Sequence, residues 1–130
     1  MRDRASVLII ESEKVLLIKR VRENSVYYVF PGGGIEKGET PEQAAVREAY
    51  EELGAKVNIK DLLGTVEFQG TQYFFLADIT DGEAGTGQGE EYTDPQRNRG
   101  TYNPLWIHLN ELPNIDVRPR AVAEKIIKLS

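Results

Sequence analysis

Residues 30–55 read FPGGGIEKGETPEQAAVREAYEELGA, and this segment organises the rest of the chain. Three consecutive glycines come first, followed by a helix-start signal and a run rich in glutamate. Thr40 is a favourable N-cap, Pro41 suits the first helical position, and a glutamine three residues after the cap completes a capping box. Gly54 supplies a C-terminal stop. The pattern predicts a helix over residues 41–53, entered from a glycine loop.

The predicted helix has an apolar side and an acidic side. At about 100° per residue, the acidic side holds Glu48, Glu51 and Glu52, and the opposite side holds Val46, Ala49, Tyr50 and Leu53. A solvated acidic face is one interpretation. Like charges three or four residues apart each cost about 0.2–0.5 kcal/mol, however, and no lysine on this helix offsets them. Three unbalanced carboxylates are what a hard cation such as Mg²⁺ or Mn²⁺ selects. The sequence therefore predicts a metal site on this helix.

The glycine segment fits neither common phosphate-binding loop. A P-loop places lysine after the second glycine of GxxxxGK[ST], but Glu39 follows Gly38 here. A dinucleotide fingerprint fails as well, because GxGxxG would need glycine at Lys37. Phosphate would therefore be bound through the metal.

Seven further stretches have strand character, and one more helix is expected. Lys14–Lys19 follows Ala5–Ile10 as a hairpin, and the apolar character of both runs predicts cover on both faces. Near the end of the chain, a turn at Asn110–Pro113 precedes a helix from Pro119, with Val122, Ile126 and Leu129 as its buried stripe. The other predicted strands span residues 27–30, 56–59, 64–69, 72–79 and 104–108.

Residues 80–100 read TDGEAGTGQGEEYTDPQRNRG and differ from the rest of the chain in composition. Glycines, a proline and many polar residues predict a loop of about 20 residues, and loops of that length are usually functional lids or disordered.

Length and composition exclude several classes of protein. A chain of 130 residues is expected to form one domain over residues 1–130. The net charge of −5 argues against binding a nucleic acid polymer. No cysteine is present, which excludes thiolate metal sites. No run approaches the roughly 18 apolar residues of a membrane span, and the N-terminus lacks the apolar core of a signal peptide, so we expect no membrane association and a cytoplasmic protein.

The central segment resembles the Nudix box, G-x5-E-x7-R-E-U-x-E-E-x-G-U, in which U is a bulky aliphatic residue. The invariant letters fall on Gly33, Glu39, Arg47, Glu48, Glu51, Glu52 and Gly54, and the U positions hold the smaller Ala49 and Ala55. The preceding hairpin, the strand-PGG entry and the W-x-x-L-x-E-L-P segment from Trp106 to Pro113 are also similar to this family. The resemblance implies an α/β fold, namely an α/β/α sandwich with a mixed β-sheet.

The resemblance also implies a chemistry. Family members hydrolyse small molecules that contain a nucleoside diphosphate, using Mg²⁺ or Mn²⁺. Carried over by position, Glu48, Glu51 and Glu52 are metal ligands, with the carbonyl of Gly32 as a further one. Arg47 would orient the glutamates through charge-assisted hydrogen bonds, and Glu39 would be a structural partner of the loop.

Other roles are less defined by the sequence. The general base is Glu48 or Glu51 of the box, or Glu90 or Glu91 of the long loop. Arg20 either contacts substrate phosphate or is a solvated strand end.

Several residues outside the box have simpler explanations. Tyr28 and Trp106 are expected in the core, and His108 is expected to be structural. The Arg97–Arg99 cluster either clamps phosphates or is solvated.

Two rival functions stay open at this point. One is a Nudix-fold sensor that binds a nucleotide without hydrolysing it, and the other is an acidic interaction domain with no metal. The resemblance allows a homodimer, for which the sequence has no signal of its own. The substrate is equally open among oxidised nucleoside triphosphates, ADP-ribose-like molecules, dinucleoside polyphosphates and nucleotide sugars.

Overall fold

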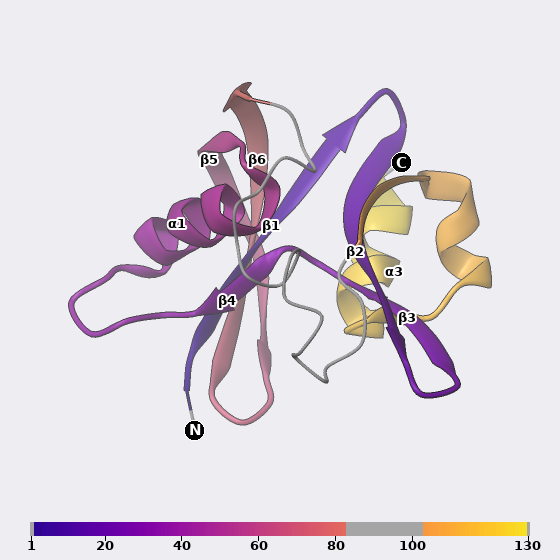
Figure 1. Cartoon of the computed structure of the whole chain (residues 1–130), viewed down its shortest axis with the longest axis horizontal. Helices are drawn as coiled ribbons and strands as arrows, with labels where there is room; N and C mark the ends of the chain where they lie inside the picture. The colour runs from indigo at the N-terminus through magenta and orange to yellow at the C-terminus, as the bar shows by residue number, and fades with distance from the viewer. Residues whose placement is uncertain (1, 83–102, 130) are drawn as a thin grey trace.

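The computed structural model describes residues 2–82 and 103–129, which form two α-helices, a 3₁₀ helix and a mixed sheet (Figure 1). In chain order the elements are β1 (Arg4–Glu11), β2 (Lys14–Arg22), β3 (Ser25–Val29), β4 (Gly32–Gly34), α1 (Pro41–Leu53), β5 (Lys56–Glu67), β6 (Thr71–Asp81), β7 (Asn103–His108), η1 (Leu109–Asn114), β8 (Val117–Arg118) and α3 (Arg120–Leu129).

The sheet opens between β1 and β2. Its order is β5-β6-β1-β2-β3-β8, with β4 added to β1 and β7 added to β2. The register joins β1 to β2 only at Ile10–Val15 and Glu11–Lys14. Beyond that point β1 pairs with β4 while β2 pairs with β3. Strands β1 and β6 run parallel, as do β3 and β8, which gives the mixed sheet that the resemblance implied.

Side chains of the two central strands alternate between two cores. On one face Val7 and Ile9 of β1 pack with Leu16 and Ile18 of β2 beneath α1. On the other face Leu8, Val15 and Leu17 pack with Val122 and Ile126 of α3. This period-2 alternation explains why both strands are nearly continuous apolar runs. The predicted cover on both faces and the α/β/α layering are confirmed (Figure 1).

The three glycines form a strand and not the loop that the sequence predicted. Gly32, Gly33 and Gly34 pair antiparallel with Ser6, Ala5 and Arg4 of β1. A Cβ at Gly32 would lie 2.4 Å from the carbonyl oxygen of Ala5. Without side chains, these residues can approach β1 and α1 closely. A run of glycines predicts a loop from its composition, so the sequence contains no sign of this strand.

The predicted strands at 56–59 and 64–69 are one strand, β5, which ends at Glu67. Register shifts against β6 fall between Lys56 and Val57, between Ile59 and Asp61, and between Leu62 and Gly64. Such irregularities interrupt the period-2 pattern without ending the strand. At the other end of the hairpin, β6 runs to Asp81, so Thr80 and Asp81 belong to a strand and not to the predicted loop.

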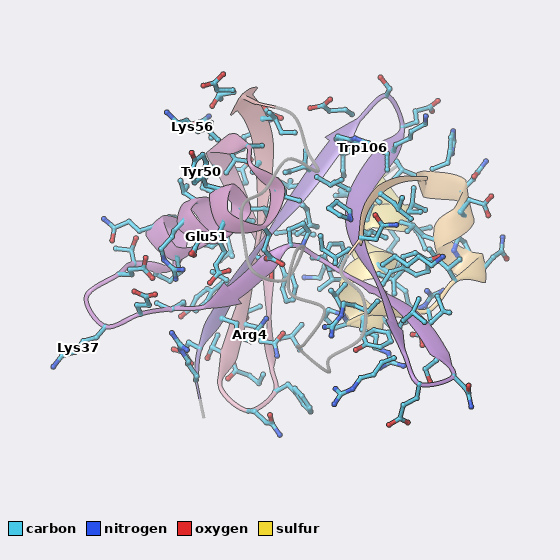
Figure 2. All side chains as sticks on the ribbon, viewed as in Figure 1. Arg4, Lys37, Tyr50, Glu51, Lys56 and Trp106 are labelled. Atoms are coloured by element: carbon cyan, nitrogen blue, oxygen red, sulfur yellow. The ribbon has the colours of Figure 1, made fainter. Side chains whose placement is uncertain are left out.

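Helix α1 forms over the predicted residues, but its buried face differs from the prediction. The capping box of Thr40 and Gln43 is present, and Gly54 adopts the left-handed conformation with φ 72°. Val46 is exposed and Glu52 is buried, whereas the sequence placed Val46 inside and Glu52 outside. Tyr50, also predicted inside, is exposed (Figure 2). The buried residues are Ala44, Ala45, Ala49, Glu52 and Leu53. Three of these five are alanines of the core beneath α1, and Glu52 is buried because its carboxylate accepts a hydrogen bond from the backbone of β4.

Three predictions about the C-terminal segment differ from the structure. Helix α3 begins at Arg120, and Val122 and Ile126 are buried as predicted, but Leu129 is 62% exposed and Ala123 is buried instead. The predicted turn at 110–113 is the 3₁₀ helix η1. Trp106 is 37% exposed, so its assignment to the core is wrong.

Two predictions about single aromatic or imidazole side chains hold. Tyr28 packs against the core beneath α3. Nδ1 of His108 accepts a hydrogen bond from the backbone N–H of Asn110 at 3.4 Å, so His108 caps η1 and is structural. Over the described ranges no helix has the length and apolar content needed to cross a bilayer.

A buried and an exposed residue of α3 provide a test of the packing. We expect Ile126→Ala to lower the free energy of unfolding by about 2–5 kcal/mol, because its side chain is fully buried. Leu129→Ala, on the exposed end of the same helix, should change it by about 0.5 kcal/mol or less. Urea unfolding of both variants measures this. Equal losses would contradict the described packing of α3.

Candidate active site

Arg47 is the centre of the hydrogen-bond network around α1. Its Nε and Nη2 donate to the two carboxylate oxygens of Glu39, at 2.7 and 3.0 Å. Nη2 also donates to the carbonyl of Gly34 at 2.9 Å. Nη1 donates to Glu48 at 3.0 Å and to Glu51 at 2.9 Å. A guanidinium has five N–H donors, so each donor of Arg47 has an acceptor. The predicted imbalance of charge on the helix is therefore wrong, because Arg47 offsets Glu48 and Glu51.

Glu39 fixes the connection between β4 and α1. Its carboxylate receives the paired bonds from Arg47 and a backbone N–H from Glu36 at 2.9 Å. These hydrogen bonds, with Arg47 the largest cause, lower the pKa of Glu39 from 4.5 to about 2. The same pairing raises the pKa of Arg47, so its charge is permanent. Glu39 thus stays ionised and holds the turn that leads into the helix.

Glu48 and Glu52 turn toward the glycine strand. Oε1 of Glu52 accepts a hydrogen bond from the backbone N–H of Gly32 at 2.7 Å, and this residue is 8% exposed. A Cβ at Gly33 would lie 2.4 Å from the carboxylate of Glu48. Burial raises the pKa of Glu48, although Arg47 acts in the opposite direction. A side chain at position 33 would therefore displace the carboxylate of Glu48 from its place beside β4.

A cleft of about 790 Å³ lies where β1 and β4 separate from β2 and β3. Its acidic wall includes Glu48 and Glu52 beside the three glycines. Four arginines also line it: Arg2, Arg4, Arg20 and Arg118. Figure 2 shows Arg4 at the start of β1, next to β4. Because the whole chain has a net charge of −5, this concentration of arginines is a local feature suited to an anionic ligand.

The cleft contains some of the predicted site residues. Glu48, Glu52, Gly32 and Arg20 line it, whereas Glu51 lies on the exposed side of α1 and reaches Arg47 (Figure 2). Glu90, Glu91 and the Arg97–Arg99 cluster lie outside the described residues. Among residues 2–82 and 103–129, no three acidic or histidine side chains are already gathered closely enough to hold a metal ion.

Sequence reasoning missed Arg118, which lies far along the chain in a two-residue strand. Its guanidinium carbon lies 4.2 Å from the centre of the Tyr27 ring, and its Nη2 bonds to Asp116 at 2.9 Å. Arg20 contacts the same ring, at 5.8 Å. Only the parallel pairing of β8 with β3 brings Arg118 to the cleft, and no local pattern indicates that pairing.

The Glu39–Arg47 pair predicts an acid-dependent loss of stability. Because the folded-state pKa of Glu39 lies below its usual 4.5, its stabilising contribution is complete above about pH 4.5 and is lost as pH falls toward 2. We expect Glu39→Gln to unfold more easily than wild type at pH 6, and the difference to shrink as pH falls to 3. Urea unfolding across this range measures it, with Glu124→Gln on α3 as control. A constant difference for Glu39→Gln would contradict the assignment.

The sequence of this chain is similar to those of known proteins. Residues 1–126 match the NUDIX domain family. A Bacillus subtilis protein provisionally named an 8-oxo-dGTP diphosphatase is 36% identical over 81 residues, which cover 60% of this chain and 53% of that protein. The RNA pyrophosphohydrolase of Psychromonas ingrahamii is 52% identical over 52 residues, which cover 40% of this chain and 28% of that enzyme.

Solved structures show the same fold. A structure of MutT from a study of Aliivibrio salmonicida and Vibrio cholerae superposes with a TM-score of 0.74 at 23% identity, covering 98% of this chain and 96% of that one. The seven invariant letters of the box, the split sheet and the match over residues 1–126 lead to one conclusion: this chain belongs to the NUDIX family.

Proposed function

We propose that the chain is a metal-dependent hydrolase that cleaves a pyrophosphate linkage in a nucleoside-diphosphate-linked small molecule. The observation that carries the proposal is the cleft, in which the carboxylates of Glu48 and Glu52 and four arginines line one cavity. Relatives named for diphosphatase and pyrophosphohydrolase activities support it.

The donor chemistry of the site fits a hard divalent cation. Glu48, Glu51 and Glu52, with the carbonyl of Gly32, would hold Mg²⁺ or Mn²⁺ through oxygen atoms alone, as such ions prefer. When bound, such an ion neutralises charge on phosphoryl oxygens and lowers the pKa of a water molecule. The buried position of Glu52 and the packing of Glu48 against Gly33 fix two of these carboxylates before any ligand arrives.

The other residues of the cleft would position the substrate. Arg47 holds the carboxylates of Glu48 and Glu51 close together through its Nη1 donors. Arg4 and Arg20 line the same cavity and would donate hydrogen bonds to phosphate oxygens, for which guanidinium groups are well suited. These cations and the carboxylates line one cavity, so the phosphate chain would contact both groups.

The substitution Glu52→Gln tests this function. Glutamine keeps an oxygen that can accept from Gly32, so the fold should be retained, but the negative charge is lost. We expect kcat/KM to fall by about 100-fold or more, the size associated with loss of one preorganised electrostatic group. The assay follows phosphate or pyrophosphate release from nucleoside triphosphates, ADP-ribose, dinucleoside polyphosphates and nucleotide sugars, with Mg²⁺, with Mn²⁺ and with a chelator.

Glu124→Gln on the exposed side of α3 is the matched control and should keep wild-type activity. Wild-type turnover from Glu52→Gln would contradict the role given to Glu52. Release of no product by the wild-type chain from any compound, together with nucleotide binding, would favour a sensor over an enzyme.

A further inference from the structure

Phe68 is the most exposed of the large apolar side chains among the described residues, at 63%. It lies at the tip of the β5–β6 hairpin and lines the cleft that holds Glu48 and Glu52. Single exposed apolar residues are ordinary on protein surfaces and need no explanation by themselves. Leu62 and Leu129 are examples here, and neither belongs to the cleft lining. The position of Phe68 inside the candidate active site distinguishes it from them.

The hairpin tip holds Phe68 in a defined place. The backbone N–H of Phe68 donates to the carbonyl of Gly70 at 2.9 Å. Gln69 and Gly70 have φ of 53° and 111°, which close a tight turn. The N–H of Thr71 donates to Asp3 at 2.9 Å, which ties the turn to the start of the chain. A Cβ at Gly70 would lie 2.8 Å from the carbonyl oxygen of Arg2, so the turn packs closely against that segment.

The other aromatic rings of the cleft are already packed. Phe30 and Phe74 line it as well, but they are 5% and 2% exposed and meet edge to face at 5.8 Å. They form part of the core beneath α3. Phe68 has no such ring contact among the described residues, so its ring is available to a ligand.

The charge of the cleft limits what that ligand can be. Four arginines and three glutamates line the cleft, the third glutamate being Glu67, and the bound cation of the proposed function would add further positive charge. An anionic occupant suits this charge, and an occupant with a flat apolar part would also contact Phe68. A nucleobase on a phosphate chain has both parts, because every base has a π-face that stacks on an aromatic ring.

We propose that Phe68 is the surface on which the nucleobase of the substrate stacks while the phosphates contact the arginines of the same cleft. The inference rests on the proposed function and deepens it, since it names the residue that recognises the base of the nucleoside part. Phe68 then sets affinity for the nucleoside part and has no part in the hydrolytic step.

Binding of non-hydrolysable analogues tests this without depending on turnover. Calorimetric titration, with Mg²⁺ present, compares α,β-methylene-ADP and the guanosine α,β-methylene triphosphate with methylenediphosphonate, which lacks the nucleoside. We expect wild type to bind at least one nucleotide analogue more than 10-fold tighter than methylenediphosphonate. Phe68→Ala should weaken that binding by about 10-fold to 100-fold, the range of base–aromatic stacking, and leave methylenediphosphonate unchanged.

Phe68→Tyr should keep wild-type affinity, and Leu62→Ala, a half-exposed residue of β5 outside the cleft lining, is the matched control. Equal affinity of Phe68→Ala and wild type for the nucleotide analogues would overturn the proposal. Equal binding of the nucleotide analogues and methylenediphosphonate by wild type would also overturn it. The same holds if Phe68→Ala differs from wild type only in its sedimentation rate and not in its affinity for the analogues, because a second copy of the chain would then cover Phe68. Failure of the proposed function is a separate result, since it is absence of hydrolysis.

Discussion

The structure around the cleft depends on one side chain, Arg47, whose five donors are all used. It joins the turn before α1 through Glu39, the glycine strand through the carbonyl of Gly34, and the helix itself through Glu48 and Glu51. A lysine has three donors and no planar fork, so it could not join all four partners. The guanidinium therefore holds together carboxylates that would otherwise repel one another, and it fixes them beside β4.

The absence of side chains on β4 is the second constraint, and it acts together with the first. Gly32 lies against the backbone of β1, Gly33 against the carboxylate of Glu48, and the N–H of Gly32 holds Glu52. The side of the helix that packs on the sheet is made largely of alanines, and Glu48 and Glu52 are its residues that meet β4. The same insertion of β4 beside β1 directs β3 to β2, which opens the sheet. The fold thus creates the cleft and places the acids on its wall in a single arrangement.

Much of this was predictable from local patterns. The capping box and Gly54 located α1, and the apolar runs predicted a two-faced sheet. The box spacing pointed to Arg47 and the glutamates, which the structure joins in one hydrogen-bond network around Arg47. The remainder depends on non-local contacts. Glu52 belongs to the buried face of α1 because the glycine strand β4 lies beside it, and a projection of the helix alone contains no information about that strand. Arg118 reaches the cleft only through pairing of β8 with β3, and Phe68 only through the hairpin turn. Both are ordinary residues in their local sequence.

The central claim is that the carboxylates gathered by Arg47 beside the glycine strand bind a divalent cation. Titration with Mn²⁺, in which electron paramagnetic resonance measures the free ion, tests it most directly because it needs no substrate. Wild type should bind Mn²⁺, and Glu48→Gln should bind it at least about 10-fold more weakly, the lower end of what loss of a metal-site group costs. Equal Mn²⁺ affinity in the two proteins, or no binding by wild type, would contradict the account.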